Sequence, residues 1–264
     1  MNVQLTIPAR FCGPPGSANG GYACGVTASA LGGSGVQVTL HAPPPLDRQL
    51  TLRRERSEAK LFDSDRLIAD ARLVNDPDAI IAGVPDALGY DVVVAAASSF
   101  NVHSYMDDHE FPTCFTCGPS REPGDGLRIF PAPTARPDLF AWPWTPDVSL
   151  FDATGELDEP VIWAALDCQS GLSWIMREPG AFVLGRLAVV IRRSPEPGER
   201  LIVAGWSGLS EGRRRQAGSA IYSESGVILA AGHATWILLT EEQRRTFAGV
   251  PADVENCPGS APNR

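Results

Sequence analysis

The chain has 264 residues, of which 44% are hydrophobic and 20% are charged, and its formal net charge at pH 7 is −9. This composition is typical of a globular protein, and the negative balance argues against a nucleic-acid partner because phosphate contacts need clustered positive charge. The sequence has no apolar run of about eighteen residues and no basic, apolar leader, so we expect no membrane partner and a cytoplasmic location.

The first half of the chain predicts one helix followed by a run of strands. A Gly-rich turn leads into a helix at about residues 20–31, and an Ala- and Val-rich stretch at 91–100 predicts a packed linker helix. Short runs of alternating apolar residues predict strands at 3–7, 36–40, 49–54, 58–62 and 67–74.

The second half predicts two strands, one long helix and an antiparallel meander. Pro160 suits the first turn of a helix from about residue 159 to 176. Strands are expected at 126–130 and 139–142 before it, and at 182–191, 200–205, 216–222 and 227–239 after it. The polar segment 207–215 predicts a loop, and the polar residues after about 240 predict a frayed tail.

The two halves repeat the same order of elements. At an offset of 151 positions, Val36 and Val38 lie over Leu187 and Val189. Each sheet has one apolar face to cover, and one helix is available in each half. We therefore predict an α+β fold, a double hotdog in which each half is an antiparallel sheet wrapped around a central helix. The expected parts are residues 1–105 with a degenerate first module and linker helix, 106–242 with the second module, and a tail at 243–264.

Three motifs resemble a known family. Residues 114–119 read Cys-Phe-Thr-Cys-Gly-Pro and precede Gly-Leu-Arg-Ile at 126–129, which is similar to the opening of hotdog thioesterase-like proteins. Residues 163–171 resemble the central helix of the phenylacetic-acid-pathway thioesterase group, where an acid follows an apolar turn, and residues 19–22 resemble the Gly-Gly turn that begins that helix. The resemblance implies a fused double hotdog that acts on acyl thioesters.

The halves depart from the family pattern in complementary ways. In the family the turn lies about nine residues before the acid, but nine before Asp167 stands Asp158, followed by Glu159 and Pro160. Nine after Asn19 stands Ala28, so the first helix lacks the acid. A fused pair that keeps one of each would hold a single composite site.

Thioester hydrolysis needs a group that attacks or activates water, and donors for the oxygen that gains charge. Asp167 is the candidate nucleophile or general base. The amides of Gly20 and Gly21, capped by Asn19, are the candidate donors because a helix N-terminus presents unpaired N–H groups. Gln169 and Ser170 are further candidates that could orient water or simply pack.

The resulting hypothesis is hydrolysis of acyl-CoA or acyl-carrier thioesters, with a small-molecule acyl thioester as the partner. Two alternatives remain open. A hotdog enoyl-thioester hydratase or dehydratase would need an Asp and His pair, and no His stands near Asp167 in sequence. A degenerate hotdog could instead bind acyl-CoA or another apolar ligand without turning it over.

The sequence also bears on cofactors, metals and assembly. Arg213, Arg214 and Arg215 form a solvated loop or a clamp for the phosphates of coenzyme A, which is part of the substrate; no other cofactor is expected. Cys114 and Cys117, with His103 or His109 nearby, invite a zinc interpretation, but a tetrahedral site needs four ligands and one Cys pair is present, so no metal is expected. The two modules predict a monomer with a dimer-like interior, or a homodimer of such chains.

Overall fold

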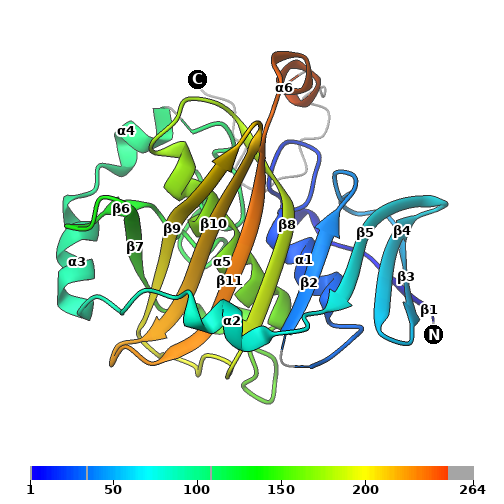
Figure 1. The fold of residues 1–264 in the computed structure, drawn as a ribbon, viewed down its shortest axis with the longest axis horizontal. Helices are drawn as coiled ribbons and strands as arrows, with labels where there is room; N and C mark the ends of the chain where they lie inside the picture. The colour runs from blue at the N-terminus through cyan, green and yellow to red at the C-terminus, as the bar shows by residue number, and fades with distance from the viewer. Residues whose placement is uncertain (1, 34, 108, 249–264) are drawn as a thin grey trace.

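The computed structural model describes residues 2–33, 35–107 and 109–248 (Figure 1). One antiparallel sheet of eleven strands runs through the molecule in the order β1-β3-β4-β5-β2-β8-β11-β10-β9-β7-β6. Strands β2 and β8 pair with each other and join the two halves into one sheet. None of the helices in these ranges is long and apolar enough to cross a bilayer.

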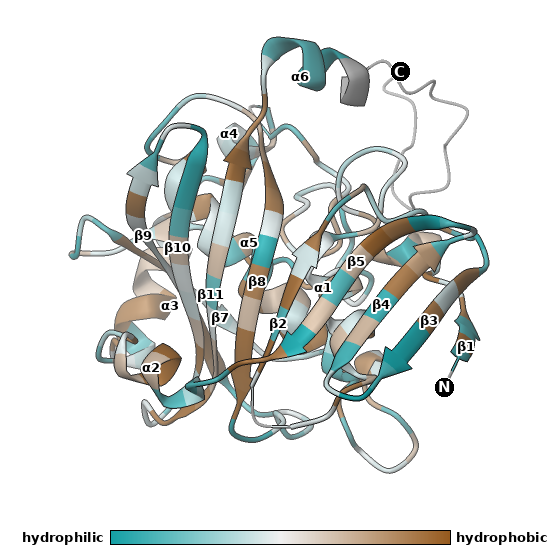
Figure 2. Ribbon diagram, turned by 45° about the vertical axis from the view of Figure 1, so that its right-hand side comes forward, coloured by the Kyte–Doolittle hydropathy of each residue, from teal (hydrophilic) through white to brown (hydrophobic). Residues whose placement is uncertain are grey.

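The first half contains α1 and five strands, followed by three helices. Its elements are β1 (Asn2–Leu5), a 3-10 turn (Ala9–Phe11), α1 (Gly20–Ala28), β2 (Gly35–Leu40), β3 (Leu50–Glu55), β4 (Glu58–Asp63), β5 (Arg66–Leu73), α2 (Pro77–Ala82), α3 (Tyr90–Ser99) and α4 (Val102–Asp107). Hydrophilic and hydrophobic residues interchange along β3, β4 and β5, because one face packs on α1 and the other meets solvent (Figure 2).

The second half contains the long helix and the meander. Its elements are β6 (Ala132–Pro133), β7 (Leu139–Trp144), a 3-10 turn (Val148–Leu150), α5 (Glu159–Ile175), β8 (Phe182–Ile191), β9 (Leu201–Glu211), β10 (Arg214–Ser223), β11 (Ile228–Leu238) and α6 (Glu241–Ala248). Residues 160–173 of α5 are all buried, as expected of a helix enclosed by its sheet rather than lying on a surface.

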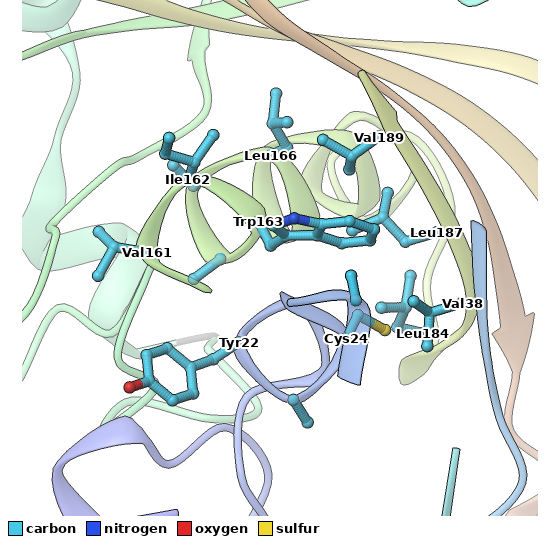
Figure 3. Packing of buried hydrophobic residues seen from close by; sticks show 14 of the residues in the cluster. Tyr22, Cys24, Val38, Val161, Ile162, Trp163, Leu166, Leu184, Leu187 and Val189 are labelled. Carbon is cyan, nitrogen blue, oxygen red and sulfur yellow. The ribbon is translucent and has the colours of Figure 1, made fainter. Parts of the chain in front are cut away.

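The central helices α1 and α5 pack directly on one another behind the sheet (Figure 1). Two glycines of α1 permit this approach: a Cβ on Gly21 would lie 2.5 Å from the carbonyl oxygen of Trp163, and one on Gly25 would lie 2.5 Å from Cα of Pro160. The indole of Trp163 then fills the space toward Leu187 and Val189 of β8 (Figure 3). The opposite face of the sheet is partly covered by α2 and α3, where Val93 packs on β7, β9 and β10.

The pairing of β2 with β8 supports the repeat seen in the sequence. Gln37 pairs with Ala188, which lies 151 positions later, while Val36 pairs with Val189 and Val38 with Leu187. Strands related by a 151-residue offset therefore meet antiparallel around the Gln37–Ala188 pair, as a pseudo-two-fold axis between the two halves requires. The α+β double-hotdog prediction is confirmed, while the predicted boundaries 1–105, 106–242 and 243–264 stay a prediction.

Three local predictions were wrong. Residues 126–130 are not a strand: Arg128 has φ 52°, and the amides of Leu127 and Ile129 donate to Phe115 and Thr116 instead of to the sheet. Most of residues 207–215 belong to β9 and β10, which meet at a turn containing Gly212; this end of the hairpin is largely exposed, so its polarity resembles that of a loop. Residues 241–248 form α6 where we expected fraying, and the rest of the tail lies outside the described residues.

Candidate active site

The site is built where the beginning of α1 meets the middle of α5. The Asn19 side chain accepts a hydrogen bond from the Tyr22 N–H at 2.9 Å, which caps α1 and fixes the direction of its first amides. The Gly21 N–H donates to Oδ2 of Asp167 at 2.7 Å. A residue of the earlier half and a carboxyl of the later half, 146 positions apart, are thus in direct contact.

Asp167 is almost fully enclosed, with 2% of its surface exposed. Its Oδ1 atom has no hydrogen-bond partner among the described residues. Burial raises the pKa of Asp167 to about 8, although the hydrogen bond from the Gly21 N–H favours the charged form. The carboxyl group therefore has one oxygen held by an amide and one oxygen available to take a proton.

The first-turn amides of α1 are distributed unequally. Those of Gly21 and Tyr22 donate to Asp167 and Asn19, whereas the Gly20 N–H has no acceptor among the described residues. Gly20 is also partly exposed, and a Cβ there would meet Leu184 at 3.0 Å and Leu40 at 3.4 Å. A free donor at a helix N-terminus, flanked by two leucines, is suited to a carbonyl oxygen that carries an apolar chain.

An aromatic layer covers the beginning of α1. The rings of Phe11 and Tyr22 stack with centroids 3.8 Å apart, and Phe115 packs against both of them edge-on. The Tyr22 hydroxyl donates to Asp158 at the start of α5, at 3.2 Å. These contacts therefore tie the beginning of α1 to the beginning of α5 and to the loop that contains Phe115.

Gln169 and Ser170 do not face α1. The Gln169 side chain is buried toward β9, where its Nε2 is 3.5 Å from the carbonyl oxygen of Val203. The Ser170 hydroxyl donates to the carbonyl oxygen of Asp167 and accepts from the Trp236 indole at 2.9 Å. These contacts match the packing alternative, and a role in orienting water stays a prediction.

The three arginines at the β9–β10 turn differ from one another. Arg215 is 6% exposed and makes a bidentate ion pair with Glu178, which lowers the pKa of that carboxyl. Arg213 and Arg214 line an open hollow of about 450 Å³ with Glu211, Gly212 and Ile237. Trp174, which lies about 10 Å along α5 from Asp167, donates to the carbonyl oxygen of Gln216 in the adjoining strand. A phosphate clamp formed by Arg213 and Arg214 stays a prediction.

The loop 112–121 contributes residues that sequence reasoning did not assign to the site. The Asn19 amide nitrogen lies 3.4 Å from the Thr116 hydroxyl, and Thr116 in turn donates to the carbonyl oxygen of Ala164. The same nitrogen lies 3.7 Å from Sγ of Cys114 and 3.5 Å from Sγ of Cys168. The motif at 114–119 signalled that this loop mattered, but its spacing gave no sign of contact with Asn19.

Comparisons with known proteins give matches among solved structures alone. No protein-family model matches the chain, and no curated protein matches it by sequence. The tesB protein of Mycobacterium avium subspecies paratuberculosis matches with a TM-score of 0.57 at 12% identity, covering 90% of this chain and 93% of its own. A Thermobifida fusca protein, provisionally designated a thioesterase II, also gives 0.57, at 14% identity over 91% of this chain and 94% of its own.

A Novosphingobium aromaticivorans protein, provisionally designated a thioesterase, gives a TM-score of 0.52 at 13% identity over 90% of this chain and 96% of its own. At sequence identities this low, the TM-scores establish a shared fold. The likeness extends along nearly the whole of each chain, across both halves and the β2–β8 junction that joins them. The chain therefore has the double-hotdog fold of these thioesterase structures.

Proposed function

We propose that the protein is an acyl-thioester hydrolase with one composite site per chain, acting on acyl-CoA or acyl-carrier substrates. The observation that carries the proposal is the 2.7 Å hydrogen bond from the Gly21 N–H to the buried carboxyl of Asp167. It brings the acid of one half to the helix N-terminus of the other, which is the pairing that thioester hydrolysis needs.

In the proposed reaction the thioester carbonyl oxygen accepts from the Gly20 N–H, and from Gly21 once Asp167 turns toward water. Oδ1 of Asp167 takes a proton from a water molecule while the hydroxide adds to the carbonyl carbon. The oxyanion collapses, the carbon–sulfur bond breaks, and the thiolate takes up the proton. If Asp167 instead attacks the carbon itself, an acyl anhydride forms and water then opens it; both routes release a carboxylic acid and a thiol.

The hydratase alternative has less support. None of the four histidines makes a hydrogen bond to Asp167 or Asn19 in the described parts of the chain. His41 pairs with Asp70 at the end of β2, and His103 is exposed. An acid and base pair on an acyl chain would need an imidazole close to the carboxyl.

The test is thiol release from a panel of acyl-CoA substrates of increasing chain length, comparing wild type with Asp167→Asn. We expect the substitution to lower kcat by about 10²–10⁴-fold, because asparagine keeps the shape but takes no proton and does not attack. Asp158→Asn is the matched control, since it changes the acid at the start of α5 and should retain activity. Binding of acyl-CoA without thiol release by wild type would favour the non-catalytic alternative, and water addition to enoyl-CoA would favour the hydratase.

A further inference from the structure

Three buried thiols converge beside the candidate active site. Cys114 and Cys117 come from the loop after α4, and Cys168 comes from α5, one residue beyond Asp167. Their sulfur atoms all lie within 4.8 Å of one another, and those of Cys114 and Cys168 are 3.6 Å apart. All three are free thiols with at most 7% of their surface exposed.

This arrangement matches the spacing around a thiophilic cation. Zinc bound tetrahedrally at about 2.3 Å from each sulfur places the sulfurs about 3.8 Å apart. The observed 3.6 Å pair is already at that separation, and the third sulfur needs only a small side-chain shift. The sequence displayed one closely spaced pair, whereas the fold supplies the third ligand from a helix 51 positions further along the chain.

The surroundings of the sulfurs are rich in hydrogen-bond donors. Nδ2 of Asn19 lies 3.7 Å from Cys114 and 3.5 Å from Cys168. The Tyr105 ring packs on the cluster, and its hydroxyl is buried with no hydrogen-bond partner among the described residues. Neutral thiols are weak acceptors, so this set of donors is better matched by thiolates.

His109 lies beside Tyr105, next to the cluster. Its ring lies edge-on to Tyr105 with centroids 4.8 Å apart, and its Nε2 is buried without a partner in the described part of the chain. Nδ1 accepts from the Phe111 N–H at 2.9 Å, which puts the ring hydrogen on Nε2. In the described part of the chain, the metal-ligating atoms within 4.8 Å of one another belong to the three cysteines, so His109 would complete a Cys3His set only if its ring moved, the hydrogen shifted to Nδ1 and the bond from Phe111 were given up.

We propose that Cys114, Cys117 and Cys168 bind one zinc ion as thiolates. Binding releases the three thiol protons, forms three zinc–sulfur bonds, leaves the fourth position of the tetrahedron to water or to a moved His109 ring, and involves no oxidation or reduction. The ion would fasten loop 112–121 to α5 and thereby hold Asn19, which touches two of the sulfurs, in its capping position. This proposal replaces the expectation that no metal is bound, and it does not depend on the proposed hydrolase activity.

The experiment uses the full chain, purified under reducing conditions, stripped with a chelator and titrated with Co²⁺ and then Zn²⁺. We expect one ion per chain by elemental analysis, cobalt–thiolate charge-transfer absorption that Zn²⁺ abolishes, and a higher Tm with zinc. Cys168→Ser and Cys114→Ser should each weaken zinc binding by at least about 100-fold.

Cys24→Ser is the matched control, because Cys24 is also a buried free thiol but lies within α1, outside the cluster. It should bind zinc as wild type does. Zinc binding that is absent in wild type, or equal in Cys168→Ser and wild type, would overturn the proposal. If the Ser variants do not fold, the cobalt spectrum and stoichiometry of wild type decide the matter.

Discussion

The two ends of the α1–α5 helix pair occupy equivalent places but carry different chemistry. At one end, Asn19 caps α1 and the amide of Gly21, two residues later, donates to Asp167. At the other end, Asp158 begins α5 without a side-chain cap bond, and the residue two positions later is Pro160. Gly21 packs against Ala164 and Gly25 against Pro160, so the helices are related by the same kind of pseudo-two-fold exchange as β2 and β8.

The second end therefore lacks both groups of the candidate site. Proline has no N–H, so the amide that would match Gly21 cannot donate. The position that would match Asp167, nine residues after the cap, is Ala28. The Asp158 carboxyl instead accepts from the Tyr22 hydroxyl and serves to hold the two helices together. The comparison thus separates an end that carries the proposed site from an end whose acid makes a contact between the helices.

The largest effect is expected from Gly21→Ala. The added Cβ would lie 2.4 Å from Cβ of Asp167 and 2.5 Å from the carbonyl oxygen of Trp163, so the helices must separate. We expect the free energy of unfolding in urea to fall by at least about 3 kcal/mol. Gly20→Ala is the control, since its Cβ would lie 3.0 Å from Cβ of Leu184 and 3.4 Å from Leu40, so that a few tenths of an ångström of adjustment suffice and the loss should be about 1 kcal/mol or less. Equal stabilities would contradict the close helix contact.

Ala28→Asp restores a carboxyl at the degenerate end and should have an intermediate effect. Ala28 is 1% exposed, so a carboxyl there loses water without gaining the amide that Gly21 provides at the other end. We expect a loss of about 2 kcal/mol or more in the free energy of unfolding. Combined with Asp167→Asn, it should restore no thiol release. Recovery of activity in that double variant would show that the end with Pro160 can also form a site.

The smallest effect is expected from Asp158→Asn, and it depends on pH. Desolvation raises the pKa of Asp158 above its usual value, although the bond from Tyr22 opposes this. The folded state then binds the proton more tightly than the unfolded chain, so this carboxyl's contribution to stability is present below pH about 3.9 and is lost as pH rises through the folded pKa.

Because asparagine does not titrate, the variant should gain stability relative to wild type as pH increases from about 4 to 7. The change should stay within about 0.5 kcal/mol, since the position is exposed. Urea unfolding of both proteins across this range measures it. A variant that loses stability relative to wild type as pH rises would contradict the sign of the shift.

Much of the fold was predictable because it depends on local patterns. The helix at 159–175, the strand order of both halves and the linker helix at 90–99 follow from apolar spacing and turn residues. The contact between Gly21 and Asp167 followed from the way the two halves complement each other, with one lacking the acid and the other the Gly-Gly turn. The spacing of the motifs was enough to predict this pair, because Gly21 and Asp167 each lie at a fixed number of residues from the start of a helix.

The misses share a different cause. Residues 126–130 alternate like a strand, yet the amides of Leu127 and Ile129 bond to the carbonyl oxygens of Phe115 and Thr116, which lie twelve and thirteen positions earlier. In the sequence Arg215 cannot be distinguished from Arg213 and Arg214, because its ion-pair partner Glu178 lies 37 positions away. The thiol of Cys168 was missed for the same reason, since it joins Cys114 and Cys117 only in the folded chain. Such contacts are set by tertiary packing, and no periodicity in the chain records them.

Pro160 stands in one of the two modules only, which bears on how a fused protein can evolve. In a dimer of identical modules every substitution is present twice, and a proline at the position of Gly21 would remove that amide N–H from both modules at once. When the two modules are joined in one polypeptide, with β2 paired to β8, a mutation changes one module and leaves the other unchanged. The loss of an amide N–H in one module can then be tolerated, and the helix end that carries the proline can serve to hold the two modules together.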